Sequence, residues 1–167
     1  MDFMEWLRPH QGYLERVALA LLGNRADAED AVQEAVLDAY RNRHQLRGGQ
    51  AAFGAWVRRI LLNQCRRAIA KRRGLVPIGD LAENAAVQAV PGPDEEATDL
   101  WNMVSRLGEH LRQVIVLHYM LDYSQAEIAD YLGIPLGTVK SRLGKALSIL
   151  RRWDRQEEGI GHDVGRV

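Results

Sequence analysis

The cationic and hydroxyl side chains of residues 138–145 are the strongest candidates for a binding function in this sequence. The reason is that the segment before them has the pattern of a short capped helix followed by a turn. Ser124 and Glu127 have the S-x-x-E spacing of a capping box, which predicts the start of a helix. Gly133 predicts the end of that helix, and the helical apolar period resumes after Pro135. Two short helices joined by a tight glycine-containing turn are typical of a helix-turn-helix.

The second of these helices would carry donors suited to a DNA major groove. Its apolar stripe, which includes Val139, Leu143 and Ala146, must pack against the first helix. The other face then presents groups that contact phosphates and purine edges: Thr138, Lys140, Ser141, Arg142 and Lys145. A generic helical hairpin with a solvated basic face is the alternative that this spacing leaves open.

A second cationic segment, residues 53–73, mixes seven basic side chains with aromatic and amide groups. Such mixtures suit single-stranded or distorted nucleic acid. Asn63 and Gln64 interrupt the apolar period and are candidates for contacting an unstacked base. Trp56 lies on the apolar stripe, so we expect it in the core.

The acidic segment DAEDAVQEA offers paired carboxylates, which act in acid–base or metal chemistry in other proteins. The alternative is a solvated helix start, where carboxylates are favoured by the helix dipole. We expect Asn24 and Asp27 just before this helix. We expect its inner face to include Val32, Val36 and Tyr40. The single cysteine, Cys65, excludes an internal disulfide, and no two histidines have metal-ligand spacing. We therefore expect no metal and no cofactor.

Composition and charge describe a soluble protein with several distinct faces. Of 167 residues, 47% are hydrophobic and 26% are charged, which is the balance of a globular protein. No apolar run is long enough for a membrane helix, and the N-terminus lacks a signal-peptide pattern, so we expect a cytoplasmic protein. Residues 41–79 hold ten bases and no acid, whereas residues 80–99 hold six acids and no base. Such blocks indicate faces that meet different partners.

Helical periodicity and the positions of proline and glycine predict an all-α fold of two small helical domains. Apolar residues recur with a helical period on both sides of the segment 74–99, which contains three of the five prolines. We predict domains at residues 1–73 and 100–155, a flexible linker at 74–99 and a flexible tail at 156–167.

Two segments carry a resemblance to the extracytoplasmic-function (ECF) group of bacterial sigma-70-type sigma factors. Residues 24–74 resemble region 2 of that group, and residues 107–152 resemble region 4, in the same order and with a short linker between them. The resemblance implies a non-enzymatic initiation factor that directs RNA polymerase core to specific promoters and aids promoter melting. It also implies three partners: the polymerase core with its β′ clamp helices and β subunit, promoter DNA, and an anti-sigma factor.

The resemblance assigns roles to individual residues. The D-x-x-D-x-x-Q-E pattern that docks on the β′ clamp helices is matched by Asp27, Asp30, Gln33 and Glu34. The part that opens and reads the −10 element is matched by Arg47, Gly48, Gly49, Asn63, Arg66 and Arg67. The −35 recognition helix is matched by Gly137, Thr138, Lys140, Ser141, Arg142 and Lys145.

The sequence departs from the family pattern at two places. Gly108 and Glu109 stand where the family usually has proline before the first core helix of region 4. The dense arginine run that usually ends the recognition helix is thinned by Gly144, Ala146, Leu147 and Ser148. This second departure predicts weaker anchoring to the DNA backbone at −35.

Two other functions compete with this interpretation. A free-standing helix-turn-helix regulator would bind operators as a dimer, but the sequence offers no spare apolar stripe for a dimer interface. A nucleic-acid-processing enzyme using the carboxylates would need a base, a metal site or a nucleotide-binding loop, and Gly48-Gly49 alone does not make such a loop.

Overall fold

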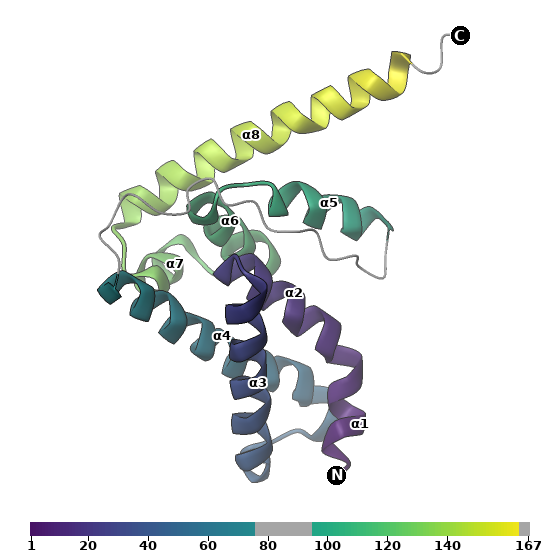
Figure 1. Cartoon of the computed structure of the whole chain (residues 1–167), viewed down its shortest axis with the longest axis vertical. Helices are drawn as coiled ribbons and strands as arrows, with labels where there is room; N and C mark the ends of the chain where they lie inside the picture. Colours follow the sequence, from purple (N-terminus) through teal and green to yellow (C-terminus); the bar gives the residue numbers. More distant parts are fainter. Residues whose placement is uncertain (76–94, 164–167) are drawn as a thin grey trace. The chain divides into compact units, whose positions relative to one another are not determined.

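The computed structural model describes residues 1–75 and 95–163, with side chains for residues 1–73 and 99–157 (Figure 1). The chain divides into two compact units, Met1–Val87 and Gln88–Val167. The described residues form helices and turns and contain no strand, which confirms the predicted all-α fold. Most of the predicted linker, residues 76–94, lies outside the described residues.

In the first unit, residues 1–75 form a bundle of three longer helices preceded by a short one. Helix α1 spans Phe3–Leu7, α2 Gln11–Leu22, α3 Arg25–Arg41 and α4 Gly49–Leu75, with single 3₁₀ turns at Arg8–His10 and Arg43–Gln45. Helix α3 packs against both α2 and α4. The apolar residues of α2 face the core, where Leu14, Val17 and Leu21 are all buried.

Small residues make up most of the inner face of α3. Its buried residues are Ala28, Ala31, Val32, Ala35 and Ala39. The expectation that Val36 and Tyr40 continue this face was wrong, since Val36 is half-buried and Tyr40 is 50% exposed. Alanine side chains end at Cβ, so they let α3 approach its neighbours closely where longer side chains would hold it off. Asn24 caps α3, and Asp27 therefore lies inside its first turn rather than before it.

Aromatic rings join α1 to α4. Phe53 is fully buried, and the centroids of the Phe3 and Trp6 rings lie 5.5 and 5.9 Å from its own. Trp56 is half-buried beside Phe53, with 6.1 Å between the ring centroids, at the edge of the core. The His10 ring covers Gly54, where an added Cβ would lie 2.6 Å from the His10 Cε1 atom. Glycine is therefore the residue that lets α4 pass under this ring.

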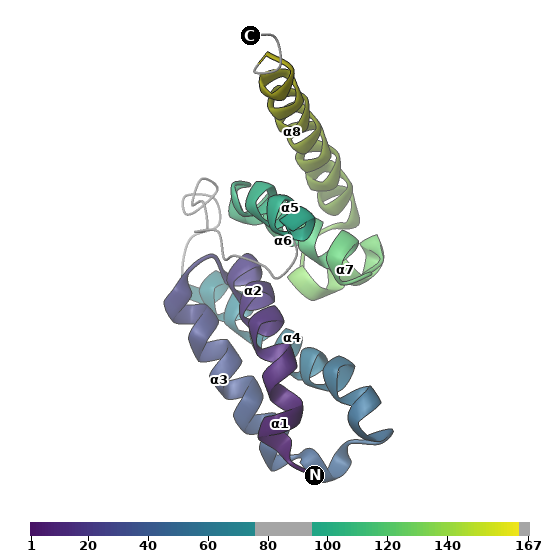
Figure 2. The ribbon, with the colours of Figure 1, turned by 90° about the vertical axis from the view of Figure 1, so that its right-hand side faces the viewer.

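The described residues of the second unit form four helices. Helix α5 spans Glu95–Ser105, α6 Glu109–Ile115, α7 Gln125–Leu132 and α8 Leu136–Asp163, and Val116–Met120 forms a π-helical turn after α6. Helix α5 thus begins within the range predicted as linker, and α8 continues through most of the range predicted as tail. Figure 2 shows α8 as one uninterrupted helix. Its distal part has a partner, because the Arg106 guanidinium lies 4.4 Å from the centroid of the Trp153 ring and pairs with Glu157 at 3.5 Å.

Arg112 is a fully buried cation in the core of the second unit. Its Nη1 atom donates a hydrogen bond to the Leu107 carbonyl oxygen at 3.0 Å, across the turn between α5 and α6. The sequence pattern gave no indication of this burial, because a charged residue beside Leu111 is normally expected at the solvent-facing side of a helix.

Candidate functional site

The helix-turn-helix forms as its local sequence predicts. Ser124 Oγ accepts a hydrogen bond from the Glu127 backbone N–H at 3.0 Å, and Glu127 Oε1 accepts one from the Ser124 N–H at 3.2 Å. Both halves of the predicted capping box are therefore present. Gly133 ends α7 at φ 65°, a left-handed conformation that glycine adopts without strain. The chain then turns directly into α8.

Helix α8 presents the residues predicted to read −35 on its first turns. Val139, Leu143 and Ala146 are buried on the inner face, as predicted. The predicted residues that are exposed are Gly137, Lys140, Ser141 and Lys145. Thr138 and Arg142 are half-buried, and Arg142 has an interaction of its own within the protein. Fewer of the predicted −35 residues are therefore fully exposed to solvent than the sequence suggested.

The loop before α4 needs its two glycines. Gly48 and Gly49 have φ angles of 93° and 64°, which side chains with a Cβ rarely adopt. An added Cβ on Gly48 would also lie only 3.0 Å from Ala52 Cβ. Arg47, Gly48 and Gly49 are all exposed. The loop is thus a solvent-facing turn whose shape depends on glycine.

Helix α4 carries the other residues predicted to act at −10. Asn63, Arg66 and Arg67 are exposed at helical spacing and share one face. Gln64, the second amide suggested for base contact, instead donates a hydrogen bond from Nε2 to Asp38 Oδ2 of α3 at 2.6 Å. The structure does not bring the loop 47–49 close to the −10 residues of α4. Gly49 and Asn63 are fourteen positions apart on the helix, which corresponds to about 21 Å.

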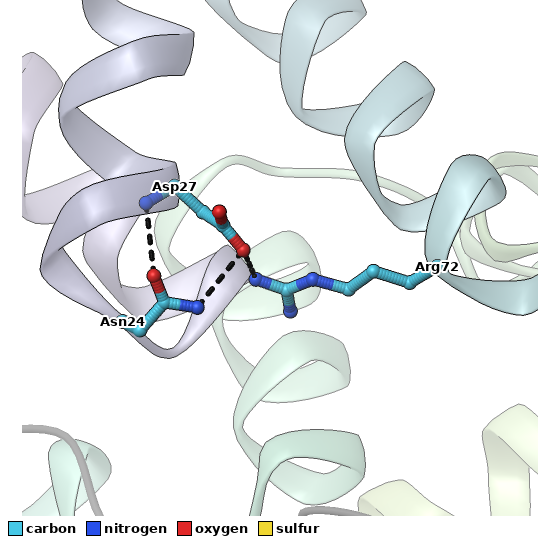
Figure 3. Close-up of polar contacts among 3 residues, drawn as sticks. All are labelled: Asn24, Asp27 and Arg72. Carbon is cyan, nitrogen blue, oxygen red and sulfur yellow. Dashed lines mark hydrogen bonds and ion pairs between the residues drawn. The ribbon is translucent and has the colours of Figure 1, made fainter. Parts of the chain in front are cut away.

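The acidic face of α3 is smaller than the sequence predicted. Asp30, Gln33 and Glu34 are exposed at helical spacing, and Leu37, which is 46% exposed, extends the same face. We call these four residues the α3 outer face. Asp27 is not part of it, because its carboxylate forms an ion pair with Arg72 of α4 (Figure 3).

Asp27 joins the start of α3 to the far end of α4. Asn24 Oδ1 accepts a hydrogen bond from the Asp27 backbone N–H at 2.8 Å, and Asn24 Nδ2 donates to Asp27 Oδ2 at 2.9 Å (Figure 3). These contacts with Asn24, followed by those with Arg72, lower the pKa of Asp27 below its usual value. Arg72 is 45 residues away in sequence, so no local pattern could have revealed the pair.

We expect Asp27 and Arg72 to show a coupling in unfolding free energy of about 0.5 kcal/mol, small because both side chains are partly exposed. The test is a double-mutant cycle with Asp27→Asn and Arg72→Gln, measured by urea unfolding at neutral pH. Because the folded pKa of Asp27 is lowered, its contribution is present above the unfolded pKa of about 3.9 and is lost as the pH falls through the folded pKa. Asp30→Asn is the control, and additive effects at Asp27 and Arg72 would contradict the pairing.

Other chemistry finds little support in the described parts of the chain. No group of three or more His, Cys, Asp or Glu side chains there is arranged to hold a metal ion. Burial raises the pKa of the Cys65 thiol to about 12, so this thiol is not a nucleophile at neutral pH. None of the described helices is both long enough and apolar enough to cross a membrane.

Comparison with known proteins identifies both halves of the chain. Residues 6–74 match the family Sigma-70 region 2, and residues 97–150 match the family Sigma-70, region 4. The ECF RNA polymerase sigma factor SigM of Mycobacterium tuberculosis is 34% identical over 90% of this chain and 76% of its own length. The RNA polymerase sigma-E factor of Streptomyces coelicolor is 31% identical over 98% of this chain and 89% of its own.

A solved structure supports the fold. The sigma factor RpoE from Bartonella quintana, crystallised with the anti-sigma factor NepR, matches with a TM-score of 0.53 and 24% identity over 90% of this chain and 95% of that one. Two sigma regions in this order exclude the free-standing regulator, which would need only the second of them. The chain belongs to the ECF RNA polymerase sigma factors, transcription initiation factors that direct the polymerase to specific promoters.

Proposed function

We propose that three separate surfaces divide the work of this sigma factor, within region 2 at residues 1–73 and region 4 at residues 100–155. The α3 outer face binds the β′ clamp helices, the loop 47–49 with α4 engages the −10 element, and α8 reads the −35 element. The observation that carries the proposal is the exposed polar face of α8, which follows a capped helix and a glycine turn.

Helix α8 has the dimensions and donors for reading a major groove. The groove is about 12 Å wide and admits one α-helix, and recognition helices contact base edges with their N-terminal residues. Lys140, Ser141 and Lys145 lie on the first turns of α8 with their side chains exposed. Lysine donates to guanine O6 and N7, and serine contacts either purine. We assign Thr138 and Arg142, which are half-buried, to the edge of this surface.

The spacing on α4 suits a DNA element that is contacted at two ends. The distance of about 21 Å between the loop 47–49 and Asn63 corresponds to roughly six base pairs at 3.4 Å each. Arg66 and Arg67, one turn beyond Asn63, provide charges for the DNA backbone. We infer that the loop and Asn63 hold opposite ends of the −10 element, and that the amide of Asn63 contacts an unpaired base.

The α3 outer face suits a protein partner. Its carboxylates are repelled by DNA phosphates, and exposed acids beside an exposed leucine suit a partner surface that is basic at its rim and apolar at its centre. Asp27 is assigned to the fold instead, because Arg72 already neutralises it.

We extend the proposal to the remaining partners by analogy with the family. The RpoE structure contains an anti-sigma factor, which supports such a partner for this chain as well. We propose contacts of region 4 with the β subunit, a cytoplasmic location together with polymerase and DNA, and no catalytic activity of the chain itself.

A promoter selection experiment tests the assignment of the DNA-reading surfaces. Core polymerase carrying the full chain would select from a promoter library randomised at both the −35 and the −10 positions. We expect Lys140→Ala to change the preferred bases at −35 only and Asn63→Ala to change those at −10 only. Each loss of discrimination should be about 1–3 kcal/mol, or roughly 5- to 150-fold at one position. The assignment fails if either variant changes the other element or changes neither.

A further inference from the structure

Three arginines lie on the distal part of α8, beyond the residues assigned to the −35 element. Arg151, Arg152 and Arg155 are all exposed. Within the part of the chain whose side chains are described, no hydrogen bond, ion pair or ring contact involves them. Three guanidinium groups within five residues form a cationic surface, which we call the distal arginine surface.

The distal arginine surface continues the face that reads −35. At 3.6 residues per turn, Arg152 and Arg155 lie within about 40° of Ser141 around the helix axis, and Arg151 lies beside them. The buried residues Val139 and Ala146 lie on the opposite side. Asp154, the single acid between residues 136 and 156, lies about 140° away from Ser141 and does not interrupt the cationic surface.

Contacts on the opposite side of α8 hold this part of the helix in place. The Trp153 ring lies under the Arg106 guanidinium, and Glu157 pairs with the same guanidinium. Glu157 is therefore engaged with Arg106 and does not neutralise the distal arginine surface. The arginines are thus presented by a helix that is packed on one side, rather than by a fraying terminus.

The distance along α8 indicates which part of a DNA duplex these arginines reach. Eleven residues separate Ser141 from Arg152, which corresponds to about 16 Å of helix. If α8 crosses a major groove about 12 Å wide with Ser141 inside it, side chains about 16 Å further along the helix come over the sugar–phosphate backbone rather than over base edges. Guanidinium groups bind phosphate oxygens in a bidentate manner.

We propose that Arg151, Arg152 and Arg155 form a phosphate-binding extension of the recognition helix, which grips the DNA backbone flanking the −35 element. The extension supplies the backbone anchoring that Gly144 and Ser148 remove from the middle of the helix. The proposal rests on the proposed reading of −35 by α8, and it adds contacts that are independent of base sequence.

The test compares two triple variants of the full chain, assembled with core polymerase. In one variant all three arginines become glutamine, and in the control all three become lysine, which keeps the charge. Promoter affinity is measured at several salt concentrations. We expect the glutamine variant to reduce the slope of log affinity against log salt by about 2–3, at about 0.9 per phosphate contact, and the lysine variant to keep the wild-type slope.

Neutral methylphosphonate linkages then locate the contacts. Placed singly on both strands beside the −35 element, they should weaken wild-type binding at two or three positions and leave the glutamine variant unaffected at the same positions. Equal sensitivity of the wild type and the glutamine variant at every position would overturn the proposal. So would an unchanged salt slope, or a loss of core polymerase binding as the main effect.

The same measurements separate this proposal from the one on which it rests. If wild-type binding is indifferent to the −35 sequence, the reading of −35 by α8 fails. If the sequence preference is present but the salt slope and the methylphosphonate pattern do not change, only the phosphate-binding extension fails.

Discussion

Replacing Gln33 with alanine and Glu34 with lysine together is expected to weaken binding to core polymerase about 30-fold, while the fold stays intact. Both side chains are exposed on α3, and the buried residues of that helix lie on its other side. A lysine placed against a basic partner replaces an attraction by a repulsion, which costs about 2 kcal/mol, and every 1.4 kcal/mol is a tenfold change in affinity.

Analytical sedimentation of the chain with core polymerase measures this change. Glu15→Lys is the matched control, because it reverses an exposed charge on a different helix of the same unit, α2. Urea unfolding of both variants checks that the domain is equally stable. Wild-type affinity in the Gln33 and Glu34 variant would remove the α3 outer face from the polymerase interface.

Arg112→Ala is expected to lower the unfolding free energy of the second unit by about 3 kcal/mol. The substitution removes a fully buried side chain, leaves a cavity and takes away the donor to the Leu107 carbonyl oxygen. Because that hydrogen bond spans the turn between α5 and α6, we expect the loss to reduce promoter binding at physiological temperature as well.

Two further variants separate the effect of the lost side-chain volume from that of the lost hydrogen bond in the unfolding experiment. Arg112→Met keeps most of the side-chain volume, so it should cost less, about 1–2 kcal/mol, because polar contacts are lost without a large cavity. Arg106→Ala removes a half-exposed arginine with a ring contact and an ion pair, and should cost less than about 1 kcal/mol. If all three variants unfold at the same urea concentration, Arg112 does not stabilise the turn.

The features that the sequence revealed are those with a local cause. The capping box of Ser124 and Glu127 and the turn at Gly133 depend on residues within ten positions of one another, so the helix-turn-helix could be predicted from its own segment. The roles of individual residues at −10 and −35 came from the family resemblance, because helical spacing alone cannot distinguish a DNA-binding face from a solvated one.

The features that the sequence did not reveal depend on contacts between distant segments. Asp27 pairs with Arg72, and Gln64 bonds to Asp38 across 26 residues, so both polar groups are used by the fold where a surface role was expected. Helical periodicity also favours large apolar residues, which is why it selected Val36 and Tyr40 of α3 instead of the alanines that are actually buried.

The alanine-lined inner face of α3 has a consequence for how such a protein diversifies. Most of the buried side chains of α3 end at Cβ, so the position of the helix is set by backbone approach rather than by interlocking side chains. Its outer residues contribute little to that packing, and exchanges among them leave the bundle unchanged. If the α3 outer face binds polymerase as proposed, substitutions on it can therefore change the affinity for polymerase without destabilising the domain that carries it.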